Sequence, residues 1–81
     1  MDNKRQAIRR RTFKGGSISL AIGTVECTIR NLSATGAMLA FPKAPDLPDT
    51  FTLIIKPEVL ERSCEVAWRS DDRIEVRFVP R

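Results

Sequence analysis

The sequence contains no histidine and no tyrosine, and its only cysteines are Cys27 and Cys64. Histidine is the commonest general base in enzymes, and no serine or cysteine here has an obvious activating neighbour. Two cysteines without further nitrogen or sulfur ligands do not form a zinc site. The sequence therefore predicts a protein that is not an enzyme and that has no metal site and no cofactor.

Long apolar runs are also missing. No run approaches the roughly 18 residues that would suggest a membrane span, and the charged N-terminus lacks the apolar stretch of a secretion signal. We therefore expect a cytoplasmic location. Each cysteine alternates with apolar neighbours, which predicts reduced thiols in the core and not a disulfide.

The chain is globular in composition, with 42% hydrophobic and 30% charged residues, and its 81 residues suffice for one domain. Residues 1–14 contain six Lys and Arg residues and one Asp, which gives a net charge of +5. Residues 15–81 contain eight basic and nine acidic residues, which gives a net charge of −1. The only apolar side chains within residues 1–12 are Met1, Ala7 and Ile8, too few to bury. We predict a flexible basic arm over residues 1–12 and a folded domain over residues 13–81.

From Phe13 onward, short alternating runs are bounded by Gly, Pro, Asn and Asp, which is typical of strands, and no stretch has a helical period. The runs predict strands at 13–22, 25–31, 37–41, 50–56, 60–69 and 73–79, with a bulge at Gly15-Gly16. Six short antiparallel strands without a helix predict an all-β fold, a small six-stranded antiparallel β-barrel, because closure removes exposed edges.

The alternation also predicts which side chains fill this barrel. Trp68 is the largest of them, and we assign it to the core instead of to a ligand-stacking role because it is in phase with Val66 and Cys64. The predicted core consists of Val25, Cys27, Ile29, Leu39, Phe41, Phe51, Leu53, Val66, Trp68, Val76 and Phe78.

The basic arm contains Arg5 and Arg9, four residues apart, followed directly by Arg10 and Arg11. A guanidinium group binds phosphate oxygens through a planar fork of donors, stacks on purines and donates to guanine O6 and N7. Alone, the arm is equally compatible with a solvated charge run or a tail that binds polyanions without specificity.

A second polar motif follows the predicted strand at 25–31. Asn31 and Ser33 are two residues apart, so an extended chain would offer an amide and a hydroxyl on one side. Gly36 permits the positive φ of a sharp turn. Alone, this pattern is also that of an ordinary turn whose Asn and Ser bond to nearby backbone.

Together, the two motifs match in order and spacing the RxxxR and (D/N)xSxxG signatures of PilZ domains, and the chain resembles that family. The similar segments read KRQAIRRRTFKGGSISL, CTIRNLSATGAML and CEVAWRSDDRIEVRF. Together they extend the resemblance over nearly the whole chain, from Lys4 to Phe78. The resemblance implies a six-stranded barrel that binds cyclic di-GMP on its outer surface, with the arm folded over the ligand.

The family's functional residues map onto five positions of this chain. The resemblance implies that Arg5 and Arg9 bind phosphate and guanine, that Asn31 binds a guanine edge, and that Ser33 binds a phosphate or a neighbouring polar group. Gly36 would shape the loop.

Two further positions, and the identity of residue 31, qualify this assignment. Arg10 lies beside the motif and is expected to add electrostatic attraction. Glu75 stands where many members have Gly before the Val-x-Phe of the last strand, and its charge is expected to weaken an anion site. Asn31 stands where Asp is also common, and an amide accepts a hydrogen bond without a full charge.

The sequence thus predicts a bacterial second-messenger receptor or adaptor that changes its surface on binding cyclic di-GMP and signals through an unidentified protein partner. One alternative is a PilZ-like protein-interaction module that does not bind the dinucleotide. Another is a small basic barrel that binds nucleic acid, but such barrels usually expose several aromatic side chains, whereas those here mostly fall in core phase.

Overall fold

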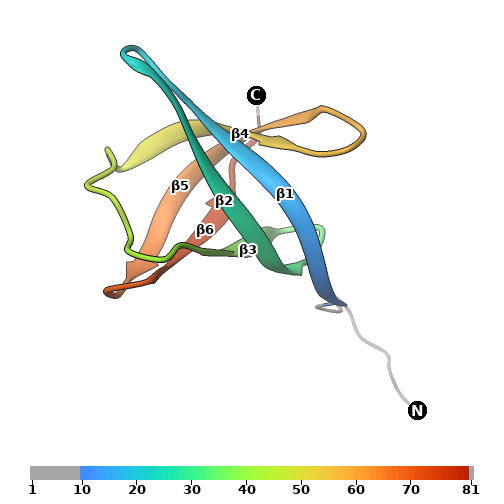
Figure 1. Cartoon of the computed structure of the whole chain (residues 1–81). Coiled ribbons are helices and arrows are strands. Elements are labelled where there is room, and N and C mark those ends of the chain that lie inside the picture. The colour runs from blue at the N-terminus through green and yellow to red at the C-terminus, as the bar shows by residue number, and fades with distance from the viewer. Residues whose placement is uncertain (1–9, 81) are drawn as a thin grey trace.

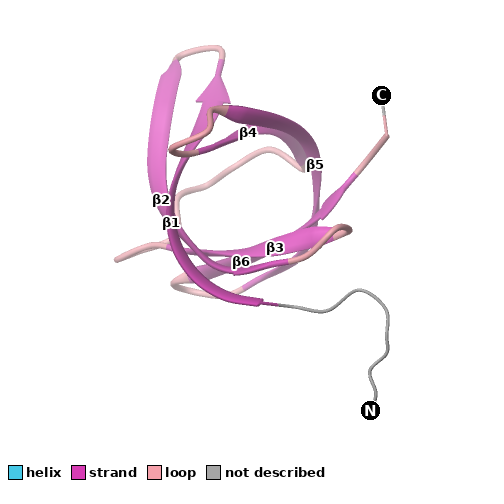
Figure 2. Ribbon diagram, turned by 90° about the vertical axis from the view of Figure 1, so that its right-hand side faces the viewer, coloured by secondary structure: helices cyan, strands magenta, loops and turns pink. Residues whose placement is uncertain are grey.

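The computed structural model of the protein describes residues 10–80, which form six strands. They are β1 (Arg10–Leu20), β2 (Gly23–Leu32), β3 (Gly36–Ala40), β4 (Thr50–Ile55), β5 (Leu60–Arg69) and β6 (Arg73–Phe78). Every pairing is antiparallel, and the order β1-β2-β3-β6-β5-β4 closes on itself through β1 and β4 (Figure 1). The predicted six-stranded barrel is confirmed, and Figure 2 shows the strands wrapped around its interior.

Most strand boundaries agree with the predicted ones, and β5 has the predicted range. β1 begins at Arg10 instead of residue 13, and it is long because it pairs with β2 along its length and with β4 over its second half. The predicted bulge at Gly15-Gly16 is wrong, because both glycines pair in register with β2 and the register shift lies between Arg11 and Lys14. Over residues 10–80, no helix is long and apolar enough to cross a membrane.

The barrel interior holds the hydrophobic core, and the alternation predicted much of it. Val25, Cys27, Val66 and Phe78 are only partly buried and pack against its edge. Leu47 was missed because it comes from the loop between β3 and β4 and not from a strand. The buried apolar residues are Ile18, Ile29, Ala37, Leu39, Phe41, Leu47, Phe51, Leu53, Ile55, Cys64, Ile74 and Val76.

The prediction that Trp68 belongs to the core is wrong, since its side chain is 51% exposed. Val66 pairs with Val76 and Trp68 pairs with Glu75, so Ala67 is an additional residue in β5. One additional residue shifts every following side chain to the other face of the sheet. Trp68 therefore lies on the outer surface of the barrel.

Both cysteines are free thiols, as predicted. Cys64 is buried and Cys27 is half-buried. Burial disfavours the thiolate and raises the pKa of Cys27 to about 12 and the pKa of Cys64 to about 11. Because the thiolate is the reactive form, neither cysteine should react in the folded protein.

We therefore expect a thiol reagent such as DTNB to label the native protein slowly at about pH 8, where an ordinary thiol reacts readily. In denaturant, the same reagent should label two thiols per chain at once, because Cys27 and Cys64 are the only cysteines. Rapid native labelling of either thiol would contradict the burial described here.

Candidate ligand-binding site

The predicted site residues that the structure describes gather at one end of the barrel. Arg10 begins β1 and pairs with Leu32, the last residue of β2, directly before Ser33. Figure 1 shows this start of β1, in blue, beside the β2–β3 turn. Arg5 and Arg9 lie outside the described residues. The chain therefore enters the barrel next to the predicted Asn31–Gly36 motif.

A bulge in β2 decides which way Asn31 faces. Ile29 is fully buried, so strict alternation would also turn Asn31 inward. Instead, Ile29 pairs with Leu39 and Asn31 pairs with Met38, which leaves Arg30 as an additional residue. Met38 lies between two fully buried residues of β3 and therefore faces outward, and directly paired residues share a face. The bulge thus presents Asn31 on the outer surface.

Asn31 belongs to a row of outward-facing residues that crosses four strands. Met38 pairs with Glu75 of β6, and Glu75 pairs with Trp68 of β5. With strands about 4.8 Å apart, the row extends over roughly 14 Å. We call Asn31, Met38, Glu75 and Trp68 the outer row. It offers an amide at one end and a half-exposed indole at the other.

Ser33 lies just beyond β2, and its hydroxyl bonds within its own turn. Its Oγ accepts hydrogen bonds from the backbone N–H groups of Thr35 at 3.2 Å and Gly36 at 3.3 Å. The Ser33 N–H donates to the Gly36 carbonyl oxygen at 3.0 Å. These are the contacts of an ordinary turn, which was one of the two interpretations of this motif. They hold the turn in place at the rim of the barrel.

Gly36 is required for a reason other than the predicted one. The expected positive φ at Gly36 is wrong. Within residues 10–80, Gly23 is the only glycine with a positive φ. A Cβ at Gly36 would lie 2.3 Å from the Val76 carbonyl oxygen of β6. The Phe78 N–H also donates to the Thr35 carbonyl oxygen at 2.8 Å. Gly36 therefore allows the turn to approach β6 closely.

This close approach predicts that Gly36→Ala destabilises the protein by about 1–3 kcal/mol, because the backbone of β3 or β6 must move to accommodate the methyl group. Gly15→Ala is the matched control in the same barrel, since its Cβ would meet nothing nearer than Lys56 Cδ at 3.9 Å. Chemical denaturation of both variants measures the difference. Equal stabilities would show that the turn and β6 are not in close contact.

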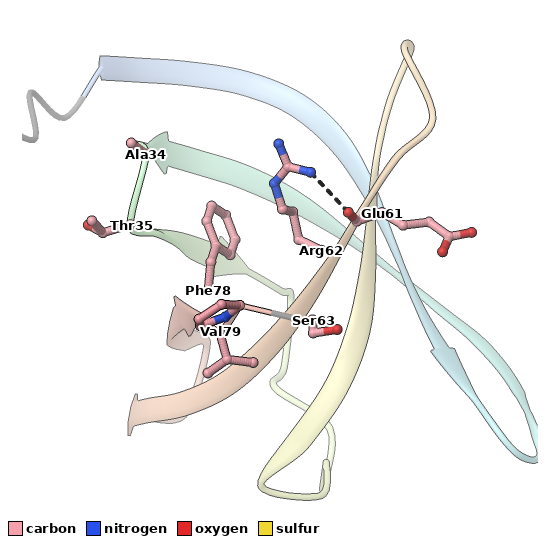
Figure 3. Close-up of a pocket in the computed structure, with 8 residues that line it drawn as sticks. Ala34, Thr35, Glu61, Arg62, Ser63, Phe78 and Val79 are labelled. Carbon is pink, nitrogen blue, oxygen red and sulfur yellow. Dashed lines mark hydrogen bonds between the residues drawn. The ribbon is translucent and has the colours of Figure 1, made fainter.

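Below the turn, two adjoining pockets open at the same end of the barrel. One has a volume of about 430 Å³ and the other about 190 Å³, and Ala34, Arg62 and Phe78 line both. Ser33 lines the smaller one. We call the two together the mouth pocket. Figure 3 shows the larger one, with the Arg62 guanidinium and the Phe78 ring facing the same space.

Two cationic side chains line the mouth pocket, and they differ in their partners. Lys14 Nζ lies 3.3 Å from both carboxylate oxygens of Glu58. The pKa of Glu58 is lowered by a hydrogen bond from its own backbone N–H and by Lys14. Arg62 Nη1 instead donates to the Glu61 carbonyl oxygen at 3.1 Å. No group of three or more His, Cys, Asp or Glu residues within the described part of the chain could hold a metal ion.

The sequence prediction missed Arg62, although a signal for it existed. Leu60, Arg62 and Cys64 alternate along one predicted strand, so the phase that predicts a buried Cys64 also directs Arg62 inward. A charged residue in a core phase marks a position that requires an explanation.

The described residues thus form a closed barrel with a polar turn and an outward amide at one end and an exposed indole farther along the outer row. The family model of the PilZ domain matches residues 3–81. The chain belongs to the PilZ domain family, whose members are binding and adaptor domains and generally receptors for cyclic di-GMP. Among curated proteins, none is similar enough to this chain to count as a match.

Proposed function

We propose that this protein is a cyclic di-GMP receptor that acts as an adaptor. The observation that carries the proposal is the bulge at Arg30, which turns Asn31 outward beside the entry point of the basic arm. A bulge that redirects a polar side chain at a strand end is a common device of binding sites. Arg9 directly precedes Arg10, which pairs with Leu32, and we therefore propose that Arg9 contacts a ligand held at Asn31.

In the proposed complex, the arm and the barrel contribute different contacts. Arg5 and Arg9 bind phosphate and guanine through their guanidinium forks. Asn31 bonds to a guanine edge, because its amide both donates and accepts. Ser33 offers its hydroxyl to a phosphate, in place of one of its turn contacts. Arg10 adds positive charge near the ligand.

Signalling follows from the ordering of the arm. Coupled folding and binding of such a segment costs roughly 2–5 kcal/mol, which the charge-assisted arginine contacts must offset. Once the arm lies over the ligand, the surface around the β2–β3 turn is different, and a protein partner distinguishes the two states. We place this switch in the bacterial cytoplasm, where the two free thiols persist.

The nucleic-acid alternative receives little support from the structure. Phe41 and Phe51 are buried, Phe78 is half-buried, and Trp68 is the one exposed aromatic side chain among residues 14–80. A nucleic-acid barrel uses several aromatic side chains as stacking platforms. The protein-interaction alternative differs from our proposal only in whether the dinucleotide binds, so calorimetry separates the two.

Titration calorimetry of the whole chain should show saturable binding of cyclic di-GMP that excess GTP does not abolish. Arg9→Ala should weaken this binding about 10- to 100-fold, because a hydrogen bond to a charged group contributes about 1.5–3 kcal/mol. Lys43→Ala is the matched control, since Lys43 is an exposed cation in the loop after β3. Unchanged affinity of Arg9→Ala would overturn the site, and no binding by the parent would favour the protein-interaction module.

Trp68 is the only tryptophan of the chain, so its fluorescence reports on the outer row. We expect cyclic di-GMP to change its emission with the same saturation curve that calorimetry gives, because a ligand on the outer row covers the indole. Asn31→Ala should shift that curve to higher ligand concentration. Calorimetric saturation with unchanged emission would show that the ligand does not reach Trp68.

A further inference from the structure

Arg62 occupies a position of β5 whose side chain faces the barrel interior. It pairs with Leu53 of β4, which is 0% exposed, and directly paired residues share a face of the sheet. The next inward position along β5 is Cys64, which is 1% exposed, and its Sγ donates to the Arg62 carbonyl oxygen at 3.6 Å. Leu60, the inward position on the other side of Arg62, is 43% exposed, and Arg62 is exposed as well, so this arginine stands where the inward row of β5 leaves the core and reaches the barrel mouth.

The guanidinium group leaves the interior at the mouth pocket. The long stem of an arginine covers apolar surface while its charged head stays in contact with water. Arg62 Nη1 donates to the Glu61 carbonyl oxygen, and within residues 10–80 no carboxylate lies within ion-pair distance of Arg62. This differs from Lys14, whose charge Glu58 offsets in the same pocket.

The walls of the mouth pocket complete a site for an anion with a flat apolar part. Phe78 offers a ring and Ser33 a hydroxyl. Figure 3 shows Ala34 and Thr35 on the turn beside the Phe78 ring. Leu32, Ile55 and Leu60 line the smaller pocket with apolar surface. A guanidinium beside an aromatic ring suits a phosphate attached to a nucleoside, since the fork binds oxygens and the ring packs on a base.

We propose that Arg62 is an additional ligand-binding residue of this protein, which holds a phosphate of the dinucleotide at the barrel mouth while Phe78 packs against the adjoining nucleoside. This inference rests on the proposed function. The ligand then lies across the rim of the barrel, over the β2–β3 turn. It contacts Asn31 on the outer side of the turn and Arg62 on the inner side. Neither sequence motif includes Arg62, because it comes from β5.

Two variants of Arg62 in the full chain test this assignment by calorimetry with cyclic di-GMP. Arg62→Met keeps the unbranched stem and removes the charge, and it should weaken binding about 10- to 100-fold. Arg62→Lys keeps the charge without the fork and should recover part of the loss. Arg73→Met is the matched control, because it removes the same charge at the start of β6, five residues from Phe78 and about 17 Å along the strand.

Stability and salt dependence separate a contact from a structural effect. Arg62→Met should unfold at a temperature close to that of the parent, since methionine fits an inward position. Its affinity should also fall less steeply with salt, because one phosphate contact is lost. If the unmodified protein binds cyclic di-GMP and Arg62→Met binds it with the same affinity and salt dependence, this inference is overturned and the proposed function stands. A parent that binds no cyclic di-GMP would overturn the proposed function and this inference with it.

Discussion

The strict alternation of a closed barrel is the constraint on which the rest of this structure depends. Every strand residue faces either the interior or the surface, so a residue whose phase is inward reaches the surface only where the alternation is interrupted. The chain does so at Arg30 in β2 and at Ala67 in β5. The two bulges turn Asn31 and Trp68 to the surface, at opposite ends of one row of paired residues. The strand pairing that closes the barrel thus also decides which side chains of the candidate site face the surface.

Close contact between the β2–β3 turn and β6 connects this register to the barrel mouth. The Ser33 hydroxyl holds the turn, and the absence of a side chain at Gly36 lets the Val76 carbonyl oxygen lie next to it. The turn thereby becomes the shared rim of two surfaces, with the outer row on one side and the mouth pocket on the other. In the proposed complex, a ligand that contacts both sides passes over Ser33 and Ala34, which belong to the family motif.

The sequence predicts the barrel because its strand alternation is local, and it predicts the two motifs because each is contiguous. It does not predict the bulges, because an additional residue is visible only against the pairing of a neighbouring strand. That is why Trp68, in phase with Cys64 in the sequence, was placed in the core, and why Asn31 would face inward by simple alternation. Arg62 shows the opposite case, since its inward phase is evident from Leu60 and Cys64, but only the structure shows that no carboxylate of residues 14–80 forms an ion pair with it.

The distribution of charge follows from the same arrangement. The outer row itself carries the acidic residue Glu75, whose partners on the neighbouring strands are Met38 and Trp68. Arg69 and Arg77 lie nearby on β5 and β6, but they form ion pairs with Asp49 and Glu65. In the proposed complex, attraction of the dinucleotide therefore comes from the basic arm, residues 1–12, and from Arg62 at the barrel mouth. In that arrangement, the barrel supplies shape and hydrogen-bonding groups, and the positive charge comes from the arm and the mouth.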